Sequence, residues 1–518
     1  MINRRSIAGN SFWYGLESVI DASVSLAMSV AVARIIGPQR LGYFIYLTFL
    51  VNFAARMGGS GPGSATRKYL SEYLGRDEPG MARSVFFTML KWHTGIGFLM
   101  AFIGWGLTFA FGDPDQRLVA CIMVASLIAS VVNAVPSQAN MAAQNFALNV
   151  PASLTSLLAY VIIVVLTLLL NWGLVGLAAA MFVRRTLEML MRLVPAMKWA
   201  RQLPKQKVTG SMARQLMTFS GQSLAIALLL IVVWDRSELL FLKRFCQIQE
   251  VTFYSVAFSI TESLLMLPNV IGAAVSARLM VDYGRTRESI APLASTSIRY
   301  LALLVFPAYI GLAALSEPIV RVVYGQSYLP AIPVVAISLI LAVPKAFYWF
   351  PSAMLQAADR QSVMFRWLLA LAFFNIGIDL ALIPRFGAVG AAVGNGIAQA
   401  AAVFILMIVA ARVCQIPLPW ASLTKTLCLS LIMGGIVSFA VKPLPPAAAL
   451  VLGPVLGVLV YLTLLRLTRS ITSNDLARIR DFESRLPASL RRLCWSLLEW
   501  LAGRQAVEEP SPMEVVAP

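Results

Sequence analysis

The chain has 518 residues, of which 59% are hydrophobic and 13% are charged, and its mean hydropathy is +0.76. Soluble domains carry about 25% charged residues, so this composition excludes an ordinary soluble enzyme or binding domain. The formal net charge of +18 does not indicate nucleic-acid binding, because the sequence has no basic cluster interleaved with base-stacking aromatic residues. We therefore expect an all-α integral membrane protein.

Apolar segments that could cross a bilayer recur from residue 11 to about residue 469. A spanning helix needs about 20 predominantly apolar residues, and by that measure the sequence predicts about 14 transmembrane helices. They are expected at 11–35, 41–60, 84–111, 117–143, 149–170, 174–196, 213–242, 252–277, 293–315, 332–357, 363–384, 388–411, 420–441 and 446–466. The glycine-rich stretch MGGSGPGS (57–64) is expected to close the second span with flexible backbone.

Basic residues are concentrated in alternate connections between the predicted spans. Clusters fall at 67–83, 192–214, 278–299 and 360–366, whereas most of the intervening connections are poor in Lys and Arg. An excess of Lys and Arg marks the cytoplasmic loops of membrane proteins. The pattern therefore predicts that both termini lie in the cytoplasm.

Three weak internal similarities have nearly the same spacing, and the first, between LGYFIYLTF (41–49) and VTFYSVAFS (251–259), spans about 210 residues. NWGLVGLAAAM (171–181) resembles RFGAVGAAVGN (385–395) 214 residues later, and AAQN (142–145) matches AADR (357–360) after 215 residues. Close helix packing explains such Gly/Ala-rich pieces one by one, but it does not explain a shared spacing. A duplication with an even number of helices per repeat is common in transporters, which place the substrate site between the two halves.

The repeat predicts four parts of the chain. Residues 1–209 would form an N-terminal lobe of six spans, and residues 210–414 a C-terminal lobe of six pseudo-symmetric spans. Residues 415–469 would add two trailing spans. Residues 470–518 are expected to form a cytoplasmic tail, which begins with an amphipathic basic helix on the membrane surface and ends in disorder.

Five acidic residues fall inside predicted spans. They are Glu17, Asp21, Asp235, Glu238 and Glu262. Glu17 and Asp21 are four residues apart and Asp235 and Glu238 three apart, so each pair is expected to share a helix face. Because each charge at the membrane centre costs about 2.5–3.5 kcal/mol, these groups must face a hydrated interior or pair with bases.

Arg34 and Arg56 are candidate partners for these acids. In one interpretation the acids are structural ion pairs. In the other they bind and release a proton or a sodium ion that couples transport to an ion gradient.

Basic residues at membrane depth are candidates for binding an anionic substrate. Arg56, Lys91, Arg184 and Lys345 are assigned to a cavity that holds a pyrophosphate, because Arg forms bidentate phosphate contacts and Lys supplies a compact charge. Snorkelling to the membrane surface is the alternative for Lys91 and Arg184. Lys345 follows Pro344, which is expected to break helical hydrogen bonding at a gate or cavity wall.

The sequence offers little support for an enzyme. It has no Walker loop, HExxH or GxSxG motif, and its five cysteines are scattered without a CxxC pair. Neither a cofactor nor a metal site is expected. Without an ATP site, uphill work would draw on a proton or sodium gradient or on the membrane potential.

Five motifs, in this order, resemble the polysaccharide transporter family. They are ARIIGPQRLGYFIY (33–46), DRSELLFLKRFCQIQEVTFYSVAFS (235–259), VYGQSYLPAIPV (323–334), LQAADRQ (355–361) and IPRFGAVGAAVGNGIAQ (383–399). That family comprises bacterial flippases of lipid-linked O-antigen and exopolysaccharide repeat units, within the superfamily of multidrug exporters and the lipid II flippase.

The resemblance implies a V-shaped transporter that opens alternately to each side of the bacterial inner membrane. It implies a central, often cationic cavity for a polyprenyl-pyrophosphate-linked oligosaccharide. Membrane lipids, a polysaccharide polymerase and chain-length proteins would be its partners. A lipid II flippase or a cation-coupled multidrug exporter of the same fold is the alternative, and a membrane polymerase or ligase is disfavoured because every predicted external loop is short.

Overall fold

The computed structural model describes residues 7–143, 149–206, 210–285 and 290–470. Every secondary-structure element in these ranges is helical, as the composition predicts. The amphipathic helix and disordered end predicted for the tail lie outside the described residues.

The first group of helices, which we call the N-lobe, precedes a long slanting helix. It consists of α1 (Ile7–Ile36), α2 (Pro38–Gly75), α3 (Pro79–Phe111), η1 (Pro114–Gln116), α4 (Arg117–Ala142), α5 (Asn149–Leu169) and α6 (Gly173–Gln202). Helices α2 to α6 pack against one another, whereas α1 contacts α5 and α2 on one side and α9 of the second group on the other.

The slanting helix α7 (Gly210–Trp234) leads into the second group, the C-lobe. It consists of α8 (Glu238–Phe245), α9 (Ile248–Arg285), α10 (Ile290–Ala314), α11 (Ser316–Ile319), η4 (Val320–Tyr324), η5 (Gln326–Tyr328), α12 (Ala331–Ala342), η6 (Val343–Phe347), α13 (Trp349–Ala357) and α14 (Gln361–Cys414). At its outer edge α15 (Trp420–Val441) packs on α10 and on α16 (Pro446–Leu467). The boundaries predicted at 209, 414 and 469 fall between helices, and the division into separate domains stays a prediction.

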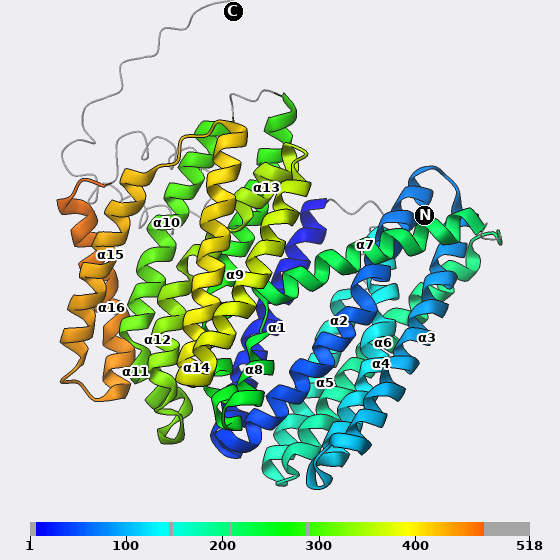
Figure 1. Ribbon diagram of the computed structural model, residues 1–518, viewed down its shortest axis with the longest axis horizontal. Helices are drawn as coiled ribbons and strands as arrows, with labels where there is room; N and C mark the ends of the chain where they lie inside the picture. Colours follow the sequence, from blue (N-terminus) through cyan, green and yellow to red (C-terminus); the bar gives the residue numbers. More distant parts are fainter. Residues whose placement is uncertain (1–6, 144–148, 207–209, 286–289, 471–518) are drawn as a thin grey trace, which may run out of the picture.

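Figure 1 shows the two lobes converging at one end, where α1 gives way to α2, and diverging toward the other. Helix α7 crosses between them, packing on α2 and on α14. We call the converging end the closed end and the other the divergent end. The turns after α2, α6 and α13 lie at the divergent end (Figure 1).

The outer surface of the helices is apolar. Phe102, Phe111 and Phe439, for example, are 74%, 85% and 82% exposed. Side chains of this kind cover a surface that meets hydrocarbon instead of water. Twelve helices in the described ranges are long and apolar enough to cross a membrane, so the chain is a multi-pass membrane protein.

Helix length and apolar composition identify twelve spans in the described ranges, which is fewer than the expected total of about 14. One of the twelve helices is α14, whose 54 residues contain a kink at Gly387 between two arms that match the spans predicted at 363–384 and 388–411. Helix α6 is not among the twelve, and its first 18 residues include Arg184, Arg185 and Glu188. The total stays a prediction.

The glycine-rich stretch at 57–64 lies within a helix, so the expectation that it closes the second span is wrong. Helix α2 continues through it to Gly75. A Cβ atom at Gly61 would collide with the carbonyl oxygen of Ser220 in α7, and one at Gly59 would lie 3.5 Å from Ala134 Cβ in α4. The glycines allow α7 and α4 to pack closely against α2, which is a common use of small residues between membrane helices.

Two glycines at equivalent places in the internal repeat have positive φ angles. Gly173 and Gly387, which occupy equivalent places in the two similar segments, both adopt left-handed conformations, with φ of 60° and 55°. Other residues adopt this conformation only with strain. Both positions therefore favour glycine, and the duplication of the chain stays a prediction.

Candidate functional site

A pocket of about 310 Å³, which we call the inter-lobe pocket, lies where the N-lobe meets α7 and the segment that leads into the C-lobe. Its walls come from α1, α2, α5, α6, α7 and the segment between α7 and α8, so residues distant in the sequence meet there. The segment after α7 contributes Asp235 and Arg236, because the helix ends at Trp234 instead of continuing through the predicted span to residue 242. Non-helical backbone at membrane depth is tolerated where it lines such a cavity.

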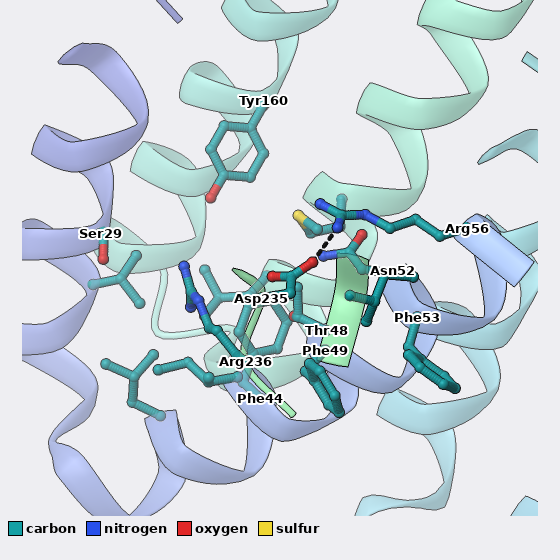
Figure 2. A pocket seen from close by; sticks show the side chains of 16 residues that line it. Ser29, Phe44, Thr48, Phe49, Asn52, Phe53, Arg56, Tyr160, Asp235 and Arg236 are labelled. Carbon is teal, nitrogen blue, oxygen red and sulfur yellow. Dashed lines mark hydrogen bonds and ion pairs between the residues drawn. The ribbon is translucent and has the colours of Figure 1, made fainter. Parts of the chain in front are cut away.

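Two arginines and one carboxylate dominate this inter-lobe pocket. Arg56 of α2 forms an ion pair with Asp235. Figure 2 shows Asp235 between Arg56 and Arg236, with the hydroxyl of Tyr160 directed toward the same space. The Arg236 guanidinium stacks over the Phe258 ring, 4.4 Å from its centroid, and has no salt bridge within the described residues.

A second pair of arginines lies behind the pocket on α6. Arg184 pairs with Asp21 of α1 and stacks over Tyr160, 5.3 Å from the ring centroid. Arg185 donates a hydrogen bond of 2.7 Å to Oδ1 of Asn52, which itself lines the pocket. The cationic character of this wall therefore extends beyond the two arginines in direct contact with the cavity.

Glu17 and Asp21 share a helix face, as predicted. Both are directed at α6, where Glu17 lies near Arg192 and Glu188 and faces Ser153 of α5. Arg192 forms an ion pair of 2.7 Å with Glu188. Of the two suggested partners, Arg56 does pair with one of the five acids, Asp235, whereas Arg34 forms no salt bridge with an acid among the described residues.

Arg34 has a structural role at the closed end. It donates to the carbonyl oxygens of Val322 and, at 2.6 Å, Val323 in η4. The hydroxyl of Tyr328 donates to the Ala33 carbonyl at 2.8 Å. These bonds join the end of α1 to the C-lobe, which explains why Arg34 is not available to the acids of α1.

Of the remaining predicted basic residues, Lys345 lies near the site and Lys91 lies on the surface. Lys345 lies in the 3-10 segment η6, where Pro344 interrupts the helix as expected, and pairs with Glu262 of α9. Its Nζ atom also donates to the Trp234 carbonyl at 3.3 Å, beside the break that carries Asp235. Lys91, in contrast, is exposed on α3 and does not line the inter-lobe pocket.

Asp235 and Glu238 do not share a helix face, so that expectation is wrong. The turn between Trp234 and Glu238 directs Asp235 into the inter-lobe pocket, whereas Glu238 is fully buried in the C-lobe. Oε2 of Glu238 accepts a 2.9 Å hydrogen bond from the Tyr254 hydroxyl. Asn395 in turn donates to that hydroxyl at 2.5 Å.

Asp379 of α14 is a further candidate residue that the sequence analysis missed. It is fully buried, and neither of its carboxylate oxygens has a hydrogen-bond partner in the described residues. Oδ1 of Asn375 and Oδ1 of Asn395 are also without donors. The sequence already indicated this candidate, because Asp379 is an acid inside the span predicted at 363–384.

Glu238, Tyr254, Asn375, Asp379 and Asn395 form what we call the C-lobe polar cluster. Glu238 and Asp379 are close enough to interact electrostatically, and no ion pair neutralises either one within the described residues. A cavity of about 30 Å³ adjoins Tyr254 and Asn395, which is enough for one small ion or water molecule. Unpaired carboxylate and amide oxygens suit a proton or a hard cation.

The fold and the polar inter-lobe pocket define a transporter. The structure of the lipid II flippase MurJ in an inward closed conformation is similar, with a TM-score of 0.71 and 16% identity over 88% of this chain and 98% of that one. An inward-facing multidrug resistance MATE family transporter of the MOP superfamily has a TM-score of 0.59 and 16% identity, over 76% of this chain and 94% of the other. At this identity the similarity shows the fold alone.

Sequence relatives place the chain within polysaccharide biosynthesis. The model of the polysaccharide biosynthesis protein family matches residues 31–333, and the chain belongs to that family. The succinoglycan biosynthesis transport protein ExoT of Rhizobium meliloti (strain 1021) is 25% identical over 389 residues, which cover 73% of this chain and 74% of ExoT. The predicted family is therefore confirmed, and the chain is a membrane transporter of polysaccharide biosynthesis with the fold of known flippases.

Proposed function

We propose that the chain is a flippase that moves polyprenyl-pyrophosphate-linked oligosaccharide repeat units across the bacterial inner membrane. The observation that carries this proposal is the inter-lobe pocket, in which Arg236 forms no salt bridge with a described residue and Arg56 is paired with Asp235. A glycan on a pyrophosphate is far too polar to cross hydrocarbon unaided. Its polyprenyl chain can remain in the lipid throughout.

Arg56 and Arg236 are suited to the pyrophosphate. A guanidinium presents five N–H donors in a planar fork and binds phosphate oxygens in pairs. When a diphosphate enters, it competes with Asp235 for Arg56, so that substrate binding would loosen a contact between α2 and the segment after α7. A ligand that binds one state better in this way shifts the balance between inward-facing and outward-facing states.

The C-lobe polar cluster is the best candidate for ion coupling. Asp21, Asp235 and Glu262 each pair with an arginine or lysine, whereas Glu238 and Asp379 have no such partner in the described residues. Two buried carboxylates that form no salt bridge among the described residues favour taking up a proton or a sodium ion, and Arg236 is close enough to Glu238 to interact with it electrostatically. Coupling by Asp21, Asp235 or Glu262 would require their ion pairs to open during the cycle. Glu17 forms no salt bridge among the described residues and lies near both Arg192 and Glu188, so it stays a candidate beside the cluster.

The distribution of basic loops supports an orientation. The turns after α2, α6 and α13 lie at the divergent end and belong to the stretches rich in Lys and Arg. By the positive-inside rule this end would face the cytoplasm, together with both termini. The conformation in Figure 1 would then be inward-facing, ready to receive a lipid-linked glycan from the leaflet where it is made.

The sidedness of the lipid-linked glycan tests this function. In cells that lack the protein, a glycan-modifying reagent that cannot cross the membrane should label the outer leaflet much less than in wild-type cells. The wild-type gene should restore labelling, and Arg236→Gln should not. Labelling unchanged by loss of the protein would contradict the proposal.

The same experiment separates the alternatives. If the repeat units are distributed normally but lipid II accumulates on the cytoplasmic side, the cargo is lipid II. If both lipids are distributed normally and the cells become sensitive to cationic drugs, the protein is a multidrug exporter. Coupling is tested separately, by measuring transport in proteoliposomes under a proton gradient or a sodium gradient.

A further inference from the structure

A second cavity, which we call the α2–α3 groove, lies on the N-lobe toward the closed end. Its volume is about 1040 Å³, and it is formed by α2, α3 and α4, with η1 and residues of α8 and α9 at one end. This volume is at the upper limit of the range of about 300–1,000 Å³ that is usual for small-molecule sites. It shares Phe53 with the wall of the inter-lobe pocket but plays no part in the function proposed above.

The body of the groove is apolar and faces outward. Leu47 and Leu50 of α2 line one side. Ile103, Leu107 and Phe111 of α3 line the other side, and they are 51%, 55% and 85% exposed. A groove with such a lining beside the apolar outer surface of a membrane protein suits a hydrocarbon chain, which has no polar groups to satisfy.

One end of the groove is cationic. Arg40, at the start of α2, and Lys243, in the last turn of α8, both line the groove, and both side chains are exposed. Neither has an ion pair or hydrogen-bond partner in the part of the chain that the structure describes. Asp113 is the one carboxylate in the lining of this groove, and its Oδ1 accepts a 3.1 Å bond from the backbone N–H of Asp115.

The two cations belong to different lobes. Arg40 is part of the N-lobe, whereas Lys243 moves with the C-lobe, because α8 packs on α14 and α9. The lobes are in close contact at this point: a Cβ atom at Gly42 would collide with the carbonyl oxygen of Ile248, and Thr252 donates to the Pro38 carbonyl at 2.6 Å. A single anion bound by Arg40 and Lys243 would therefore connect the lobes at the closed end.

We propose that the α2–α3 groove binds an anionic phospholipid of the bilayer, with one acyl chain along α3 and the phosphate between Arg40 and Lys243, and that the bound lipid favours the conformation in which this end is closed. The apolar body and the two unpaired cations match the two parts of such a lipid. The lipid can favour this conformation because separation of the lobes would remove one of the two cations. A basic residue contributes about 1 kcal/mol to binding an anionic lipid, or about fivefold in affinity.

Native mass spectrometry of the purified full-length protein with phosphatidylglycerol tests the site. Arg40→Gln and Lys243→Gln should each weaken retention of one lipid by about fivefold. Leu107→Trp, which fills the groove, should also weaken it. The matched controls are Arg244→Gln, next to Lys243 but outside the groove, and Leu99→Trp, which is exposed on α3 and does not line the groove. Equal retention in groove variants and controls would overturn the site.

The conformational effect has its own measurement. Spin labels at Leu170 of the N-lobe and Ser327 of the C-lobe, with the native cysteines replaced, report the distance between the lobes near the closed end by electron paramagnetic resonance. Nanodiscs of phosphatidylcholine mixed with phosphatidylglycerol should increase the short-distance population relative to phosphatidylcholine alone, and Lys243→Gln should remove the increase. Glycerol 3-phosphate should have no effect, because it has no chain to bury. A distance distribution unaffected by phosphatidylglycerol, or an effect retained in Lys243→Gln, would overturn the proposed role of the lipid.

Discussion

Arg56 in α2 and Asp235 in the break between α7 and α8 form an ion pair across the inter-lobe pocket. The two side chains are 54% and 26% exposed, so the pair resembles a surface salt bridge, which contributes at most about 1 kcal/mol to stability. The pair is placed to respond to a ligand in the pocket, and its removal should affect function more than folding.

The first prediction tests whether loss of the Arg56–Asp235 pair affects transport more than stability. Arg56→Gln should reduce export of the polysaccharide at least about tenfold, which corresponds to about 1.4 kcal/mol of lost anion binding. The midpoint of thermal unfolding should remain close to that of the wild type. Polymer yield in a deletion strain and unfolding of the purified protein measure the two effects. Arg321→Gln, which breaks the exposed ion pair with Glu317 outside the pocket, is the matched control. A large loss of stability without a specific loss of export would contradict the prediction.

A second prediction concerns the C-lobe polar cluster. Asp379→Asn and Glu238→Gln should each abolish the dependence of transport on an ion gradient, because each removes one of the two buried carboxylates of the cluster that form no salt bridge with a described residue. Folding should be preserved, because neutralising an unpaired buried carboxylate removes a desolvation cost. Transport in proteoliposomes with and without the gradient is the measurement. Glu317→Gln serves as the control, and gradient-driven transport by both cluster variants would exclude the cluster as the coupling site.

The third prediction addresses the closed end. Tyr328→Phe removes the hydrogen bond to the Ala33 carbonyl, which should cost about 1 kcal/mol in the conformation shown in Figure 1. The population of the alternative conformation should rise about fivefold. Accessibility of a cysteine placed at Val322 to a reagent outside the cell reports this change. Tyr461→Phe, which removes a bond to Leu303 far from the closed end, should leave the accessibility unchanged.

A fourth prediction concerns the crossing of α2 and α7. Gly61→Val should destabilise the protein by about 1–3 kcal/mol, since its side chain would collide with the backbone at Ser220. The yield of folded protein and the midpoint of unfolding in detergent measure the effect. Gly106→Val in α3 is the control, because a Cβ atom there meets nothing within 4 Å. Equal stability of the two variants would show that the crossing tolerates a larger separation of the helices.

A fifth prediction compares the two repeat-related glycines. Gly173→Ala should cost about 1–2 kcal/mol from the left-handed backbone alone, because a Cβ atom there has no neighbour within 4 Å. Gly387→Ala should cost more, since its Cβ atom would lie 2.8 Å from the Glu250 carboxylate, which accepts the backbone N–H of Ala388. Thermal unfolding of both variants tests this order, with Gly377→Ala, which has open space at the Cβ position, as the control.

The sequence by itself predicted the helical membrane class, the break at Pro344 and the family. These features depend on local composition and on motif order, which are visible without contacts between distant segments. The positions of Arg56, Arg184 and Lys345 at membrane depth were also evident, because a charged residue stands out in an apolar span.

The partners of these charges were decided only by the tertiary structure. The spacing of Asp235 and Glu238 indicates one helix face, but the helix ends at Trp234 and directs the two carboxylates to different places. The partner of Asp21 is Arg184, 163 residues away, instead of a base nearby in the chain. Within a continuous helix, the spacing of residues determines which side chains share a face. The point at which a helix ends, and the helix that packs against it, depend on burial and hydrogen bonding across the whole bundle.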